Sequence, residues 1–151
     1  MPQSLGQIYV HIIFSSKARR PFLQDAAIRD ELHRYLGGAC NKLDCPALRV
    51  GGVADHVHIL CRLGRTVSVG ELVRELKRES SQWVKTKSPS LADFYWQNGY
   101  AAFSVSPSDV EPIREYIARQ DEYHRSETFQ DEYRRLLRQH GLEWDERYVW
   151  D

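Results

Sequence analysis

Residues 53–62 constrain the fold of this chain more than any other stretch, because they read as a turn followed by a strand with two histidines. Side chains alternate between the two faces of a strand, so His56 and His58 point to one face, whereas Val57 and Ile59 point into the opposite layer. Imidazole is the commonest metal ligand near neutral pH, and this spacing lets two rings hold one divalent ion from one side. The segment therefore predicts a strand with a candidate metal site on one face.

Two metal-dependent classes with histidine-rich strands are excluded by the neighbouring residues. A histidine-triad hydrolase requires a third histidine at position 60, where this chain has Leu60. A cupin requires a glutamate four or five residues after the pair, and the next one, Glu71, lies at the predicted start of a helix. A pair of ordinary strand histidines that bind no metal is the simplest alternative.

The length and composition of the chain indicate a single globular domain. A chain of 151 residues builds one two-layer core, and its 42% hydrophobic content is typical of water-soluble proteins. No apolar run approaches the roughly 18 residues of a membrane span, and the first 14 residues lack the pattern of a signal peptide. The three cysteines Cys40, Cys45 and Cys61 are an odd number without a compact ligand spacing. We therefore expect a reduced, cytoplasmic protein with no membrane partner.

The net charge of zero conceals an uneven distribution of charge along the chain. Basic residues outnumber acidic ones in residues 1–90, and the reverse holds in residues 91–151. Basic side chains in one loop and along one predicted helix can attract phosphate groups, although the helix also carries glutamates and is equally compatible with a solvated face. The candidate DNA-binding residues are Lys17, Arg19, Arg20, Lys77 and Arg78.

The order of predicted elements indicates an α+β fold. Residues 8–14, 47–53 and 56–63 have the composition of strands, and residues 94–105 read as strand, turn and strand around Asn98-Gly99. Helical periodicity covers residues 26–41, and capping boxes at Ser68 and Ser108 open two further helices, the second running to about His124. The order predicts a ferredoxin-like antiparallel sheet with helices on one face, in which the first and third strands are central neighbours. A shorter helix closed by Gly141 follows in the tail.

The helix that begins at Ser108 is expected to lie across the histidines on the open face of the sheet. Tyr116 and Gln120 are four residues apart and therefore share one face of this helix. Gln120 offers an amide oxygen to a hard divalent cation, and Tyr116 offers a phenolic nucleophile that can attack phosphorus. A tyrosine at the edge of the core, with its hydroxyl in water, is the simpler alternative for Tyr116.

These motifs together resemble the single-tyrosine HUH transposases of the smallest bacterial insertion sequences and the related REP-associated tyrosine transposases. The resemblance rests on the histidine, hydrophobe, histidine triplet and on the tyrosine helix, in this order and spacing. It extends over nearly the whole chain. The matching segments are residues 12–15 with the basic loop that follows, 55–58, 96–100, 103–106 and 116–120.

The resemblance implies a transposase that cuts and rejoins single-stranded DNA without water or a nucleotide cofactor. By similarity, His56, His58 and Gln120 bind Mg²⁺ or Mn²⁺, and Tyr116 forms a 5′-phosphotyrosine link while freeing a 3′-hydroxyl. Relatives with two tyrosines carry the second where this chain has Gln120, which favours the single-tyrosine class. Tyr123 is the alternative nucleophile. The family further implies hairpin or single-stranded DNA as the partner and a homodimer in which the tyrosine serves either subunit.

Residues 1–125 are accordingly expected to form the catalytic domain. The tail over residues 126–151 shows no chemistry in its sequence, and we expect it to pack on the same domain or on a partner subunit. The alternative function is a non-catalytic ferredoxin-like nucleic-acid-binding module, in which Tyr9 stacks on bases. That class carries a glycine and aromatic signature on its third strand, where this chain has the two histidines.

Overall fold

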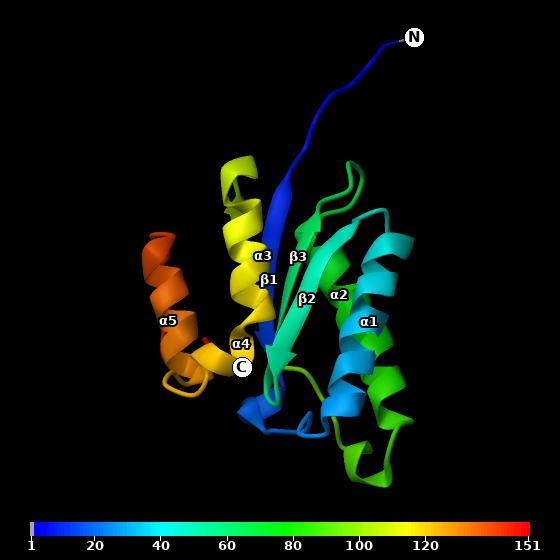
Figure 1. Cartoon of the computed structure of the whole chain (residues 1–151), viewed down its shortest axis with the longest axis vertical. Helices are drawn as coiled ribbons and strands as arrows, with labels where there is room; N and C mark the ends of the chain where they lie inside the picture. Colours follow the sequence, from blue (N-terminus) through cyan, green and yellow to red (C-terminus); the bar gives the residue numbers. More distant parts are fainter. Residues whose placement is uncertain (1) are drawn as a thin grey trace.

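The computed structural model describes residues 2–151 and confirms the predicted α+β fold (Figure 1). Its four antiparallel strands are β1 (Tyr9–Ser15), β2 (Ala47–Val53), β3 (His56–Arg62) and β4 (Ala101–Val105). They lie in the order β2-β3-β1-β4, with β1 and β3 in the centre, as expected for the ferredoxin-like arrangement. The histidine strand therefore lies directly beside the strand that carries His11.

Two long helices cover one face of the sheet, α1 (Ala26–Lys42) and α2 (Val69–Lys85). Asp25 caps the first by accepting hydrogen bonds from two backbone amides, and Ser68 caps the second by accepting from the amide of Glu71. The alternate β3 residues Val57, Ile59 and Cys61 are buried against these helices in the main hydrophobic core. The other alternate set, which includes both histidines, is thereby directed to the second face.

The second face is covered by the C-terminal part of the chain, to the left of the sheet in Figure 1. It comprises α3 (Val110–Ala118), the short α4 (Gln120–Tyr123) and α5 (Phe129–Gln139). The apolar stripe of α5 packs on β1 and β4 in a smaller core. Its buried members are Phe129, Tyr133, Leu136 and Leu137, beside Ile13, Ala101 and Phe103. None of the helices within residues 2–151 has the length and apolarity to cross a membrane.

Three short 3-10 helices complete the fold. They are η1 (Lys17–Arg19), η2 (Pro89–Leu91) and η3 (Pro107–Asp109). Within η1, Ala18 and Arg19 both have a φ of 56°, which is uncommon for residues with a side chain. The basic loop after β1 is therefore held in a costly backbone conformation.

The predicted strand before Asn98 is wrong. Residues 94–97 form a single bridge between Ser16 and Trp96 instead of a ladder. The amide of Gln97 donates to the Ser15 carbonyl, and the Ser15 amide in turn donates to the Gln97 side-chain oxygen at 2.8 Å. Because a side chain takes the place of the next backbone acceptor, the pairing stops after one residue.

The predicted continuous helix from Ser108 to His124 is also wrong in two respects. Its first turn is the 3-10 helix η3, and α3 begins after Asp109 with no side-chain cap, so the capping box at Ser108 does not form. The Ser106 hydroxyl donates to Asp109 instead. The helix then breaks at Arg119, whose φ of −110° and ψ of 24° are not helical. The break separates Tyr116 on α3 from Gln120 on α4.

Gly51 determines how closely α3 approaches the sheet. A Cβ atom at this position would lie 2.7 Å from the backbone oxygen of Ile117 and 2.8 Å from its Cγ2 atom. Both distances are shorter than real contacts of a Cβ atom, so a larger residue would force the helix away from β2. Because Ile117 follows Tyr116 directly, this close approach sets the height of the tyrosine above the histidine strand.

Candidate metal and nucleophile site

The two histidines of β3 lie on the same face of the sheet and are completely buried, as the alternation predicts. Asp55 lies 2.7 Å from Nδ1 of His56, and His11 lies 2.8 Å from Nδ1 of His58. These contacts engage the Nδ1 atom of each ring and leave both Nε2 atoms facing the space under the C-terminal helices. Such outer contacts orient the rings in metal sites and fix their tautomers.

Gln120 and Tyr116 approach these histidines from the helices above. The side-chain oxygen of Gln120 lies 2.9 Å from Nε2 of His56, and Gln120 is itself buried. The Tyr116 ring centroid is 5.9 Å from that of His58. Despite the break at Arg119, the four predicted side chains therefore lie together within one chain, namely those of His56, His58, Tyr116 and Gln120.

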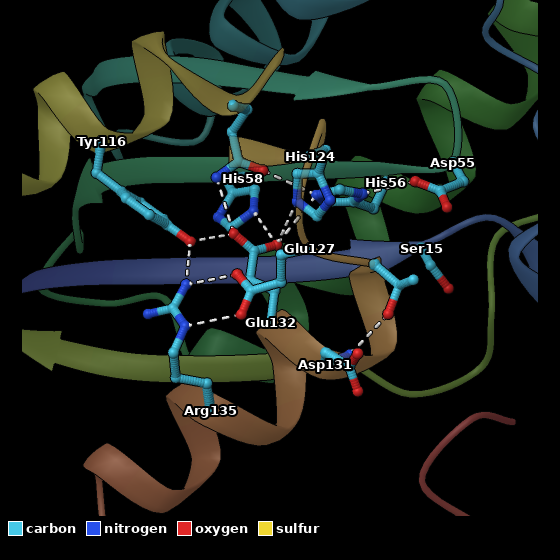
Figure 2. Close-up of polar contacts among 12 residues, drawn as sticks. Ser15, Asp55, His56, His58, Tyr116, His124, Glu127, Asp131, Glu132 and Arg135 are labelled. Atoms are coloured by element: carbon cyan, nitrogen blue, oxygen red, sulfur yellow. Dashed lines mark hydrogen bonds and ion pairs between the residues drawn. The ribbon is translucent and has the colours of Figure 1, made fainter. Parts of the chain in front are cut away.

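Glu132 of α5 occupies the centre of this group (Figure 2). One carboxylate oxygen lies 3.2 Å from Nε2 of His58 and 3.3 Å from Nε2 of His56. The other accepts a hydrogen bond from the Gln120 amide at 2.8 Å and one from the Tyr116 hydroxyl. Glu132 is wholly buried, so one carboxylate joins the histidines, the glutamine and the tyrosine.

Glu132 is not among the site residues predicted from the sequence, because the tail carries no recognisable chemical motif. A signal was nevertheless present, since Glu132 falls within the apolar stripe of α5 between Phe129 and Tyr133. A glutamate on the buried side of a helix is almost never fully buried without a partner. His124 was missed as well, and its Nε2 lies 2.9 Å from the Glu132 carboxylate.

A second tail residue contacts the Tyr116 hydroxyl directly. Arg135 donates to this oxygen at 2.9 Å, and two further donors of its guanidinium hold the Glu127 carboxylate at 2.9 and 3.1 Å. A guanidinium fixed by a bidentate carboxylate is a rigid donor. Tyr123 lies beside this arrangement, with its ring centroid 4.8 Å from that of Tyr116, but its side chain is 40% exposed.

Charge in the site is balanced between Glu132 and the imidazoles. Burial alone would raise the pKa of Glu132, but the surrounding histidines hold it well below its usual range. Burial would likewise lower the pKa of His56, and its contacts with Asp55 and Glu132 outweigh this effect and raise that pKa to about 9. Burial lowers the pKa of His58. In the metal-free site these shifts favour a Glu132 carboxylate beside a protonated His56.

The nucleophile candidate is held in its neutral form by the same surroundings. Burial raises the pKa of Tyr116 well above 10, and the adjacent Glu132 charge raises it further. Arg135 acts in the opposite direction, because a cation stabilises a phenolate. In this arrangement the Tyr116 proton rests between its own oxygen and Glu132.

The donor set fits a divalent cation. Within residues 2–151, His56, His58 and Glu132 form a buried group whose ligand atoms lie within 4.8 Å of one another. The Gln120 oxygen, in contact with His56, adds a fourth donor. Two imidazoles with carboxylate and amide oxygens suit Mn²⁺ and similar metals, and the carboxylate balances part of the ion's charge.

The candidate DNA-binding residues do not reach this site, and they differ in their availability. Lys77 is partly buried, and its ammonium donates to the backbone oxygens of Gln97, Asn98 and Gly99 at 2.7, 3.2 and 2.7 Å. All three of its donors are therefore used by the protein itself. Arg78 is exposed and pairs with Glu75 at 2.6 Å.

The basic loop after β1 presents its cations beside aromatic rings. The Arg20 guanidinium lies 4.5 Å from the Phe22 ring, and that of Arg19 lies 5.6 Å from the Trp150 ring. Lys17, Arg19 and Trp150 line a cavity of about 370 Å³. The loop is therefore an accessible basic surface at the end of β1.

Comparison with known proteins identifies a family and two similar folds. Residues 4–120 match the model of the family described as "Transposase IS200 like". A crystal structure of a presumed transposase from Deinococcus radiodurans R1 is 22% identical with a TM-score of 0.61, over 80% of this chain and 95% of that one. A REP-associated tyrosine transposase bound to a REP hairpin is 13% identical with a TM-score of 0.59, over 82% and 72% of the two chains.

The two structural likenesses support the fold, since both identities are low. No curated protein matches the chain. The family match spans β1 to Gln120 and so includes the histidine strand, the tyrosine helix and the glutamine that follows it. On this match, the chain belongs to the family of IS200-like transposases.

Proposed function

We propose that this protein cleaves and rejoins single-stranded DNA by transesterification, with Tyr116 as the nucleophile and a 5′-phosphotyrosine as the intermediate. His56, His58 and Gln120 would hold a divalent ion, Mg²⁺ or Mn²⁺, and we add Glu132 to this ligand set. The expected substrate carries a hairpin next to the cleaved strand. A hairpin-bound transposase among the similar structures supports this choice of partner.

One observation carries the proposal: side chains from four separate elements converge on a single buried point. The histidines come from β3, Tyr116 from α3, Gln120 from α4 and Glu132 from α5. A buried carboxylate among imidazoles costs free energy unless each group is paired. If these residues served only to stabilise the fold, apolar residues in their place would stabilise it more. The concentration of buried metal-ligand side chains therefore indicates a functional site.

The residues divide the chemistry between them. The Tyr116 oxygen forms a bond to phosphorus, the bond from phosphorus to the 3′-oxygen breaks, and the departing oxygen takes up a proton as a 3′-hydroxyl. Glu132 holds the Tyr116 proton at its second carboxylate oxygen before attack. Arg135 offers its N–H to the phenolic oxygen as negative charge develops there. When bound, a divalent ion supplies positive charge that polarises a phosphate oxygen.

The rejoining step is the reverse of cleavage at the same atoms. A 3′-hydroxyl attacks the phosphotyrosine, the bond from phosphorus to the Tyr116 oxygen breaks, and the phenol regains its proton. Since one phosphodiester is exchanged for another ester, no nucleotide cofactor is required. In the present arrangement Tyr116 faces the histidines of its own chain, and a homodimer stays a prediction that light scattering in solution tests.

The experiment that tests the proposal is covalent capture of a labelled oligonucleotide. Incubation with a single-stranded substrate that carries a hairpin, in the presence of Mn²⁺, should yield a protein-DNA band that survives denaturation. Tyr116→Phe removes one oxygen and should abolish the band while the protein stays folded and still binds DNA. A surviving band would refute Tyr116 as the nucleophile.

Tyr123→Phe is the matched control, because the two tyrosines are neighbours and the substitution is chemically the same. We expect the band to persist in this variant. Its loss in Tyr123→Phe, together with its persistence in Tyr116→Phe, would move the nucleophile to α4. Absence of any band with the wild-type protein, combined with binding that is insensitive to chelator, would favour the non-catalytic binding module.

A further inference from the structure

A groove on the opposite side of the molecule is not used by the chemistry described so far. It has a volume of about 350 Å³, similar to that of small-ligand pockets. One wall is α2, through Gly70, Arg74 and Ser81, and the other is the segment that precedes β4. Its floor is apolar, since Val73 and Trp96 are both buried there.

Two tyrosines at the second wall of this groove are unusually exposed. Tyr95 is 57% exposed, although it directly precedes the buried Trp96, and Tyr100 is 39% exposed. The Tyr100 hydroxyl approaches Gly70 closely enough that an added Cβ atom would lie 3.8 Å from it. Large aromatic rings at the rim of a groove offer flat apolar surfaces for stacking.

Cations surround these rings. The ammonium of Lys85 lies 4.3 Å from the centroid of the Tyr95 ring. Arg74 and Arg78 line the groove with side chains that are 73% and 53% exposed. Both arginines also contact Glu75, at 3.9 and 2.6 Å, so part of their charge is balanced by the protein.

The wall that carries the tyrosines is held in place by Lys77. Its ammonium bonds to three successive carbonyls at residues 97–99 and lies 5.0 Å from the Phe14 ring. Lys77 thereby fixes a segment without regular secondary structure to α2, and the Trp96 indole adds a second link by donating to the Ser80 hydroxyl at 2.9 Å. The stacking surfaces are therefore positioned before any ligand arrives, which reduces the entropy cost of binding.

The groove adjoins the cavity beside the basic loop. Residues 96–98 line both this groove and the cavity that contains Lys17 and Arg19. The loop that holds these two cations bonds to Asp55 through the Ser16 amide at 2.8 Å, and Asp55 contacts His56. The groove and the cavity of the basic loop therefore share one wall near the end of β1.

From these observations we propose that the groove between α2 and residues 95–100 binds unpaired nucleotides of the DNA substrate, with bases stacked on Tyr95 and Tyr100 and phosphates beside Arg74 and Arg78. Alternating aromatic and cationic side chains along a groove are the usual means of binding single strands without reading their sequence. The inference rests on the proposed function, because it assigns the groove to the same substrate.

Fluorescence anisotropy with a labelled oligothymidylate of about twelve nucleotides tests the proposal in the Tyr116→Phe background, where no covalent product interferes. Tyr95→Ala and Tyr100→Ala should each weaken binding roughly five- to one-hundred-fold, the range for loss of one stacked base. Tyr95→Phe and Tyr100→Phe keep the rings and should bind within about two-fold of the parent. A fold defect is detected separately by thermal melting.

Tyr148→Ala is the matched control, because Tyr148 is also exposed, at 63%, and has an arginine 5.2 Å from its ring, but lies in the tail. It should leave binding unchanged. Arg74→Gln and Arg78→Gln should each reduce the slope of log affinity against log salt by roughly 0.7, the value for one phosphate contact on a single strand. A duplex of equal length should bind with no dependence on Tyr95 or Tyr100.

Unchanged affinity in both alanine variants, or an equal loss in Tyr148→Ala, would overturn the groove assignment. The covalent capture assay separates this failure from failure of the proposed function. If capture depends on Tyr116 as expected, but Tyr95→Ala and Tyr100→Ala bind DNA with unchanged affinity, only the groove assignment is refuted. Binding of single strands that depends on Tyr95 and Tyr100, without any covalent product from the wild type, would refute the transesterification and leave the groove assignment in place.

Discussion

Replacing Glu132 with glutamine changes one atom of the site and removes its central charge. Glutamine keeps the shape of the side chain, but its amide nitrogen cannot accept a hydrogen bond, so the variant loses either the contact with His58 or the bonds from Gln120 and Tyr116. Neutralising one member of a buried charged pair costs about 3–5 kcal/mol, because the partner is left uncompensated. For a domain of this length, that loss lowers the melting temperature by roughly 10 °C.

The size of this loss should depend on pH in a defined way. The pKa of Glu132 is depressed, so its contribution is present above the ordinary value of 4.5 and is lost as the pH falls below it. The pKa of His56 is raised from 6.5 to about 9, so its contribution is full below 6.5 and is lost as the pH rises through 9. The difference between wild type and Glu132→Gln should therefore be largest from about pH 4.5 to 6.5.

Thermal melts of metal-free protein, followed by circular dichroism across this pH range, measure the effect. Glu143→Gln is the control, since Glu143 is an exposed glutamate of the same tail and its replacement should change stability by less than about 0.5 kcal/mol. A Glu132→Gln loss below about 1 kcal/mol, or one that does not vary between pH 4 and 9, would refute the account of Glu132 as the charged centre of the site.

Three further predictions follow from the described geometry. Gly51→Ala should push α3 away from β2, destabilise the protein by about 1–3 kcal/mol and reduce covalent capture. Gly38→Ala is the control, because open space surrounds Gly38, and it should be neutral or slightly stabilising. Urea unfolding measures the stability of the two variants, and the capture assay measures their cleavage. Burial lowers the pKa of His33 to about 4, so the free energy of unfolding should fall by about 3 kcal/mol as the pH drops from 6.5 to 4. In thermal melts over this pH range, His33→Gln should remove this loss of stability. Mn²⁺ should raise the melting temperature of the wild type but not of His58→Ala, and an equal rise in both would contradict the metal site.

The sheet and the histidine face were predictable from the sequence, because they depend on local alternation. The period of two through residues 56–62 fixes which side chains are buried with α1 and α2, and the order of elements fixes β1 beside β3. The prediction from the sequence was wrong where a non-local contact determines the local structure. Residues 94–97 have the composition of a strand, yet the Gln97 side-chain oxygen, and not a backbone oxygen, accepts from the Ser15 amide of β1, and the pairing ends there.

The candidate site was predictable only in part for the same reason. Tyr116 and Gln120 were identified by their spacing on an assumed helix, and they meet the histidines even though that helix breaks at Arg119. Glu132 lies 74 residues after His58, and no periodic pattern links positions so far apart. Its place on the apolar stripe of α5 marks a buried acid, but only the packed structure shows which partners compensate its charge.

Because α5 lies late in the chain, the ribosome completes the strands that it covers well before α5 itself. Because Glu132 follows His58 by 74 residues, roughly four to fifteen seconds separate their appearance at ordinary elongation rates. From the synthesis of Phe103 until α5 is complete, the apolar surface of Ile13, Ala101 and Phe103 has no α5 to cover it. A nascent chain at this stage is a candidate for chaperone binding, and a product interrupted before Phe129 would present the same uncovered surface to cellular proteases.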